Sequence, residues 1–218
     1  MRKLVVGTFL TVDGVMQAPG GPDEDRDGGF EHGGWSVKYW DEMMGKLIVE
    51  QTLKTAALLL GRKTYEIFAA HWPRVTDPND PVATKLSSMR KYVASRTLRK
   101  AEWHNSTILP GDAASAVARL KEQAGGEIQV TGSSNLIQTL LKHDLVDEFN
   151  LWVFPVTIGS GKRLFGDGTM PGAFRLVDAK PSSTGVVIQR YERVGKLEHG
   201  SFAVDERGRT AALWEDKS

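Results

Sequence analysis

Glu127-Ile-Gln-Val-Thr-Gly-Ser-Ser-Asn-Leu-Ile-Gln-Thr-Leu-Leu141 is the stretch that most clearly predicts how this chain folds. Residues 128–130 predict a short buried strand, and Gly132, Ser133 and Ser134 predict a tight turn. Apolar residues then recur at helical spacing. A helix that begins after such a turn offers free backbone N–H groups and the positive end of its dipole, and together these hold phosphate groups in many proteins. An ordinary junction capped by Ser133 or Ser134 has the same sequence, so both interpretations are open at this point.

A second junction of the same kind lies nearer the N-terminus. Residues 56–60 are an uninterrupted apolar run that predicts a buried strand, and Gly61 follows as the turn before a helix. Arg62 and Lys63 stand at the start of that helix, where its dipole disfavours cations. Their position makes physical sense if an anion lies between them and the backbone amides. Two such junctions in one chain favour the phosphate interpretation.

The remaining elements predict the fold class. Strands are expected at residues 3–10, 91–95, 107–109 and 148–156 and at the pair 175–178 and 186–191, and further helices from Ser36 to Thr55 and from Asp112 to residue 124. Strands alternating with helices, followed by strands alone, predict one α/β domain. Its sheet is expected to be mixed and mostly parallel, flanked by helices and completed by a C-terminal antiparallel strand pair. We place this domain at residues 1–194 and treat residues 195–218 as an extension: a hairpin, a partner contact or a loosely ordered segment.

Two regions are candidates for function without belonging to a junction. The glycine-rich stretch between Gly14 and Gly34 is long and irregular, which is typical of a loop that covers a substrate and equally of a flexible insertion. Asp41 borders the apolar stripe of the predicted 36–55 helix. A carboxylate in this place is a candidate catalytic residue, with a structural role as the alternative.

Composition excludes several classes of function. The 218 residues carry 28 Lys+Arg against 27 Asp+Glu, a net charge of +1, which gives no electrostatic reason to expect a nucleic-acid or membrane partner. There is no cysteine, and the five histidines lie far apart, so we predict no disulfide and no metal site. No apolar run approaches the roughly 18 residues that span a membrane. A cytoplasmic location is the expectation.

The two junctions resemble those of a known fold. Leu60-Gly-Arg-Lys-Thr-Tyr-Glu66 resembles the Gly-Arg-x-Thr-x-Glu helix start of dihydrofolate reductases, and Val130-Thr-Gly-Ser-Ser134 resembles their later glycine turn. The chain is more similar to the reductase domain of riboflavin biosynthesis, the C-terminal half of a bifunctional deaminase-reductase. The resemblance covers about residues 3–193 and lacks the motifs of the deaminase half, so a reductase domain alone is implied. The further matching positions are Thr11, Asp13, Gly14, Asp147, Glu148, Pro155, Gly159, Gly161, Leu164 and Phe165.

This resemblance implies a bound NADPH. Arg62 and Arg96 would meet its 2′-phosphate, because a guanidinium makes bidentate hydrogen bonds to phosphate. A homodimer is also implied. The implied cofactor residues are Gly61, Arg62 and Thr64 on the phosphates, Ser95 and Arg96 near the adenosine, and Gly132, Ser133, Ser134 and Asn135 on the pyrophosphate.

The resemblance also implies a substrate, a ribosylaminopyrimidine phosphate that receives hydride at the ribose C1. Thr11 and Asp13 would lie beside it, and Lys162 or Arg163 would bind its phosphate. The assignment of these two cations rests on residue type alone. The helix carboxylate of dihydrofolate reductases has no clear counterpart, since Asp41 fits only after a shift of one turn. Two alternatives stay open: reduction of a pterin or another small carbonyl or imine with Asp41 as proton relay, and nucleotide binding without turnover.

Overall fold

The computed structural model describes residues 1–204 and 207–214, which contain an eight-stranded sheet of order β4-β3-β2-β5-β1-β6-β8-β7. The strands from β4 to β6 in this order are parallel, while β8 and β7 run antiparallel to their neighbours. This is the mixed, mostly parallel sheet that the sequence predicts. The strands are β1 Leu4–Thr11, β2 Ala57–Gly61, β3 Arg90–Ala94, β4 Ser106–Ile108, β5 Ile128–Thr131, β6 Glu148–Phe154, β7 Ala173–Pro181 and β8 Val187–Gly195.

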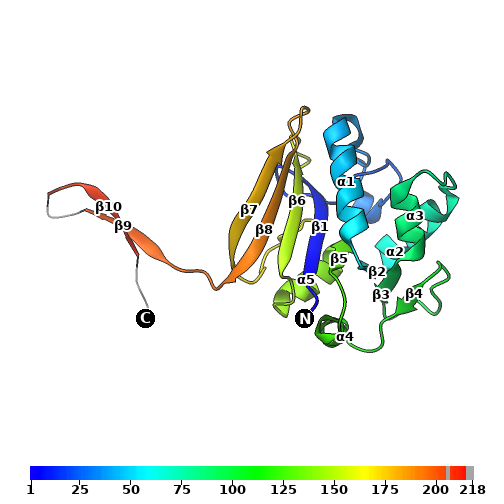
Figure 1. Cartoon of the computed structure of the whole chain (residues 1–218). Helices are drawn as coiled ribbons and strands as arrows, with labels where there is room; N and C mark the ends of the chain where they lie inside the picture. The colour runs from blue at the N-terminus through cyan, green and yellow to red at the C-terminus, as the bar shows by residue number, and fades with distance from the viewer. Residues whose placement is uncertain (205–206, 215–218) are drawn as a thin grey trace.

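Helices cover both faces of the sheet (Figure 1). Helices α1, α2 and α3 pack on one face, and α4 and α5 pack on the other. No helix in the described part of the chain is both long and apolar enough to cross a membrane. The helices are α1 Glu42–Lys54, α2 Arg62–His71, α3 Pro81–Ser88, α4 Ala113–Glu122 and α5 Ser134–Lys142, with short 3-10 turns at Asp27–Gly29, Val37–Tyr39 and Trp72–Arg74.

The central strands are apolar on both sides because both of their faces are covered. In β2, Leu59 packs in the same cluster as Ile137 of α5, while Leu58 points the other way and packs with Leu86 of α3. Both leucines are buried. Burial of each contributes about 1.5–3 kcal/mol, so β2 fixes the two helix layers to one sheet.

Helix α1 begins later than the sequence predicts. Ser36 does not cap it: its hydroxyl donates to the Pro19 carbonyl at 2.7 Å, and a 3-10 turn follows at Val37–Tyr39. The chain then straightens at Trp40, and the Asp41 carboxylate accepts the Met44 amide at 2.9 Å as the N-cap of α1. An Asp at this position is a strong cap, and it sets the start of the helix at Glu42.

The C-terminal extension contains a hairpin. Strands β9, Gly200–Val204, and β10, Thr210–Trp214, pair antiparallel and project away from the main sheet (Figure 1). Of the three alternatives for this segment, the described residues adopt the hairpin. Residues 205–206 and 215–218 of the predicted 195–218 extension lie outside the described residues.

Candidate active site

The two glycine junctions meet at the carboxyl ends of neighbouring strands. Strand β2 pairs with β5, so the turn at Gly61 and the turn at Gly132 lie side by side. The Gly61 amide donates to the Ser133 hydroxyl at 2.9 Å, and that hydroxyl lies 2.9 Å from the hydroxyl of Thr64. A Cβ added to Gly61 would lie 3.3 Å from Ser133, which shows how closely the two turns approach. One serine therefore joins the starts of α2 and α5.

The starts of α2 and α5 differ from those of the other α-helices. Helices α1, α3 and α4 each have an aspartate cap: Asp41, Asp80 and Asp112. Gly61 and Ser133, at the caps of α2 and α5, accept no hydrogen bond from their own helix through a side chain. Ser133 therefore does not cap α5 through its side chain, in contrast to the serine-capped alternative. The first N–H groups of both helices are left for water or a ligand.

A cavity of about 1440 Å³ lies over these two helix starts. All the cofactor residues implied by the resemblance line it, although they come from three separate parts of the chain. Parallel strands end at one edge of the sheet, where open α/β sheets bind their ligands. These lining residues are Gly61, Arg62, Thr64, Ser95, Arg96, Gly132, Ser133, Ser134 and Asn135.

Two guanidinium groups lie at this edge. Arg62 reaches along α2 to both carboxylate oxygens of Glu66, each at 3.1 Å, in an exposed ion pair. Arg96 is exposed and follows Ser95, whose hydroxyl accepts the Thr97 and Leu98 amides and so shapes the turn after β3. The geometry gives Ser95 a turn-forming role and leaves both arginines at the cavity wall.

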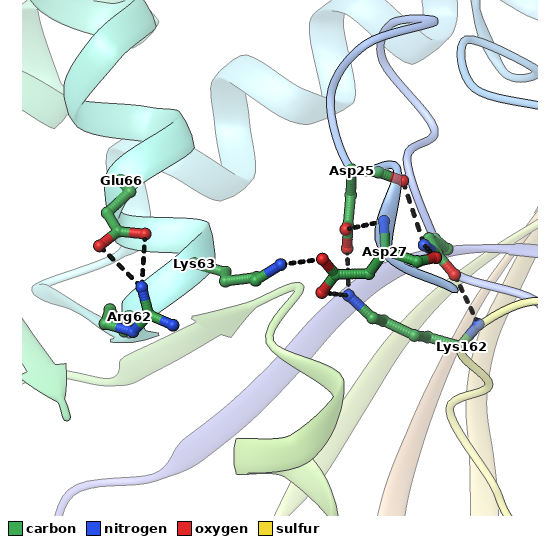
Figure 2. A network of polar contacts seen from close by, with 7 residues as sticks. Asp25, Asp27, Arg62, Lys63, Glu66 and Lys162 are labelled. Carbon is green, nitrogen blue, oxygen red and sulfur yellow. Dashed lines mark hydrogen bonds and ion pairs between the residues drawn. The ribbon is translucent and has the colours of Figure 1, made fainter. Parts of the chain in front are cut away.

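The glycine-rich loop between β1 and α1 also lines the cavity. Figure 2 shows the polar contacts that hold it. Lys162 binds the Asp27 carboxylate at 2.9 Å and also the Asp25 carboxylate, and Lys63 binds Asp27 from the start of α2. Gln17 supports the loop from inside, donating to the Asp25 and Asp27 carbonyls at 3.1 and 3.0 Å. The loop is thus held by two lysines that also line the cavity.

Replacing Asp27 by Asn is expected to loosen this loop. Hydrogen bonds from Lys63 and Lys162 lower the pKa of Asp27 to about 2, so its contribution to stability is fully present above about pH 4 and is lost as the pH falls toward 2. At neutral pH the variant should show several-fold faster amide hydrogen exchange over residues 19–34, with no change in α4 and α5. Asp23→Asn is the matched control, because the ion pair of Asp23 within the described residues is with the nearby Arg26. Equal exchange in the two variants would contradict the clamping role of Asp27.

Three predicted substrate residues lie outside the cavity lining. Asp13 accepts the Thr11 hydroxyl and the Ile158 and Gly159 amides, the last at 2.7 Å. Arg163 donates to the Gly159 carbonyl at 2.9 Å and to the Asp13 carbonyl. The structure uses Thr11, Asp13 and Arg163 to join the turn after β1 to the loop after β6, and their place beside a substrate stays a prediction.

Asp41 does not reach the cavity either. Besides capping α1, its carboxylate accepts the Ser183 amide and hydroxyl at 2.9 and 2.7 Å. These bonds from Met44 and Ser183 lower the pKa of Asp41, and bonds from Thr11 and backbone amides lower the pKa of Asp13 to about 2. Each set of hydrogen bonds favours the charged form of its carboxylate, and the catalytic roles of Asp13 and Asp41 stay predictions.

Sequence reasoning missed the side of the cavity that faces α1. Phe9, Trp40 and Trp152 line it, together with Gly7 and Gln129. Phe9 and Trp152 lie in strands that the sequence predicts to be buried, and Trp40 lies in the apolar stripe of the predicted 36–55 helix. Their sequence pattern is therefore that of core residues. Among the described residues, no group of three or more His, Asp or Glu is placed to hold a metal ion.

Comparison with known proteins agrees with the fold. YyaP of Bacillus subtilis (strain 168) is 29% identical over 188 residues, covering 85% of this chain and 92% of YyaP. A protein from Shewanella sp. PV-4 that is assigned to riboflavin biosynthesis has a TM-score of 0.64 at 18% identity, covering 88% of this chain and 99% of its own. Dihydrofolate reductase from Enterococcus faecalis, complexed with NADP(H) and RAB-propyl, has a TM-score of 0.53 at 15% identity, covering 88% and 96%.

These structures confirm the dihydrofolate reductase-like α/β fold that the sequence predicts. The family model of the RibD C-terminal domain matches residues 2–188, which confirms the resemblance to the reductase domain of riboflavin biosynthesis. The chain therefore belongs to the RibD C-terminal domain family.

Proposed function

We propose that this protein is an NADPH-dependent reductase that acts on a small heterocyclic substrate. The observation that carries the proposal is the meeting of two uncapped helix starts, joined through Ser133, at a cavity that Arg62 and Arg96 also line. Free amides and guanidinium groups are the donors that a dinucleotide phosphate needs. Membership in a family of reductases and the NADP(H) held by the Enterococcus faecalis relative support the same cofactor.

The residues of this chain fit the parts of NADPH in order. The amides at the start of α5, after Gly132 and Ser133, would hold the pyrophosphate, and Thr64 would add a hydroxyl from α2. Arg62 and Arg96 would bind the 2′-phosphate. When bound, NADPH supplies the hydride for the reduction. The loop held by Lys63 and Lys162 would keep water away from this part of the cavity.

Titration with NADPH tests the proposal directly. Trp40, Trp72 and Trp152 line the cavity, so saturable quenching of tryptophan fluorescence is expected at micromolar cofactor. Loss of NADPH absorbance with a ribosylaminopyrimidine phosphate, a pterin or a small carbonyl compound then identifies the substrate. Binding without oxidation of NADPH by any of these would favour a nucleotide-binding protein, and no binding at millimolar NADPH would refute the reductase.

A further inference from the structure

The proposed reduction needs a proton as well as a hydride, and the carboxyl groups of the cavity are the candidates to deliver it. When hydride adds to the carbon of a C=N or C=O bond, the nitrogen or oxygen gains an electron pair that a nearby acid protonates. Within the described residues, six carboxyl side chains line the cavity, three from the glycine-rich loop and three from α3, α4 and their approaches. They are Glu24, Asp25, Asp27, Asp77, Asp80 and Asp112.

Five of these six side chains are held by other groups of the fold. Asp25 and Asp27 form the ion pairs with the two loop-holding lysines (Figure 2). The other three accept backbone amides at 2.9 Å, as N-caps of α3 and α4 or in the turn before α3: Asp80, Asp112 and Asp77. In all five cases a cation or an N–H group binds the carboxylate, so these side chains have a structural role.

Glu24 differs from the other five, because no cation of the described chain acts on it. Its side chain is half-buried, and its Oε2 accepts the Gly20 amide at 2.5 Å. Burial raises the pKa of Glu24, the amides of Gly20 and Gly21 oppose this rise, and the negative charge of Asp25 adds to it. The balance leaves the pKa of Glu24 above its ordinary value, which favours the protonated carboxyl group that a general acid needs.

Contacts on both sides of Glu24 fix the segment that carries it. On one side, the Ser36 hydroxyl donates to the Pro19 carbonyl at 2.7 Å. On the other side, Lys162 binds the carboxylate of Asp25, the next residue. Between these anchors, the Glu24 amide donates to the Gly21 carbonyl at 3.2 Å and closes a short turn. Glu24 is therefore held at the cavity wall by a short segment that is anchored at both ends.

We infer that Glu24 is the general acid of this reductase. As hydride adds to the carbon of a C=N or C=O bond in the substrate, the nitrogen or oxygen of that bond takes the proton of the Glu24 carboxyl group. Glu24 is left as a carboxylate, which the Gly20 amide stabilises, and it regains a proton from water before the next turnover. This inference deepens the proposed function and rests on it.

Glu24→Gln tests this role, because it removes the acidic proton and keeps the shape of the side chain. With whichever ribosylaminopyrimidine phosphate, pterin or small carbonyl compound oxidises NADPH, kcat should fall about 100-fold, while the substrate KM and the NADP⁺ affinity stay unchanged. In the unaltered protein, kcat should fall as the pH rises through the pKa of Glu24, and this dependence should be absent from Glu24→Gln. Glu31→Gln is the matched control, because Glu31 belongs to the same loop, is exposed and does not line the cavity.

NMR of the Glu24 carboxyl group gives a second readout that does not depend on turnover. In protein labelled with carbon-13 at the glutamate carboxyl groups, the resonance that is missing from Glu24→Gln belongs to Glu24. Its pKa should lie above the ordinary value for glutamate, about 4.3.

Three results would overturn the inference and leave the proposed function standing. They are a pKa of Glu24 at or below the ordinary value, an unchanged kcat in Glu24→Gln, and an equal loss of kcat in Glu31→Gln. Absence of NADP⁺ binding, or of NADPH oxidation with all three classes of substrate, in the unaltered protein would instead refute the proposed function and this inference with it.

Discussion

Replacing Gly132 by valine is expected to weaken NADPH binding by at least about 100-fold. Gly132 has a φ of 56° and is followed by Ser133 with a φ of 67°. A β-branched residue is strained in this left-handed region, by about 1–3 kcal/mol. Its Cβ would also lie 3.4 Å from Thr64. Relief of this backbone strain and of the close contact with Thr64 would move the first turn of α5 away from the pyrophosphate. Each charge-assisted hydrogen bond lost there is worth about 1.5–3 kcal/mol.

Fluorescence titration with NADPH measures this effect, and circular dichroism checks that the variant is folded. Gly168→Val is the matched control, because Gly168 also has a positive φ, of 79°, with no atom within 4 Å of its Cβ position. It carries comparable backbone strain at a place outside the cavity. If Gly168→Val lost NADPH affinity to the same extent, general destabilisation would explain the result and the role of the Gly132 turn would be disproved.

Replacing Arg62 by alanine is expected to weaken NADPH about 10- to 100-fold and to leave NADH almost unchanged. The two cofactors differ in the 2′-phosphate, and a bidentate guanidinium–phosphate contact is worth about 1.5–3 kcal/mol. Glu66 would lose its partner, but this pair is exposed and contributes little to stability. The loss should therefore appear in the ratio of the two affinities.

Paired titrations with NADPH and NADH measure that ratio. Arg62→Lys should give a smaller loss than alanine, since it keeps the charge and loses the planar pair of donors. Arg90→Ala is the control, because Arg90 is exposed at the start of β3, at the end of the strand opposite Arg96. Equal losses for NADPH and NADH in Arg62→Ala would show that Arg62 does not recognise the 2′-phosphate.

The two glycine junctions could be predicted from sequence because their cause is local. A tight turn from strand to helix needs glycine and small residues within a few positions, as at Gly61 and Gly132. Their meeting through Ser133 depends on β5 lying beside β2, and no local pattern encodes which strands are neighbours. The resemblance to a family supplied that information, and the cavity lining agrees with it.

Several of the predicted site residues make contacts that are remote in sequence. Asp13 was predicted from the family resemblance, and Asp41 from its place beside an apolar stripe. Asp13 is bound by amides at Ile158 and Gly159, and Asp41 by Ser183. The pairing of Lys162 with Asp25 and Asp27 spans more than a hundred residues in the same way. Sequence spacing gave no signal for any of these contacts.

The strand order has a consequence for how the protein is made. In the described chain, β1 pairs only with β5 and β6, so this strand has no partner until residues 128–131 leave the ribosome. Pairings between segments so far apart form slowly and leave apolar strand edges exposed in the meantime. Nascent chains that stop before β5 should therefore depend on chaperones. Ser133 follows β5 after Gly132, so the junction between the starts of α2 and α5 forms only once β5 lies beside β2, and β6 then adds Trp152 to the cavity wall.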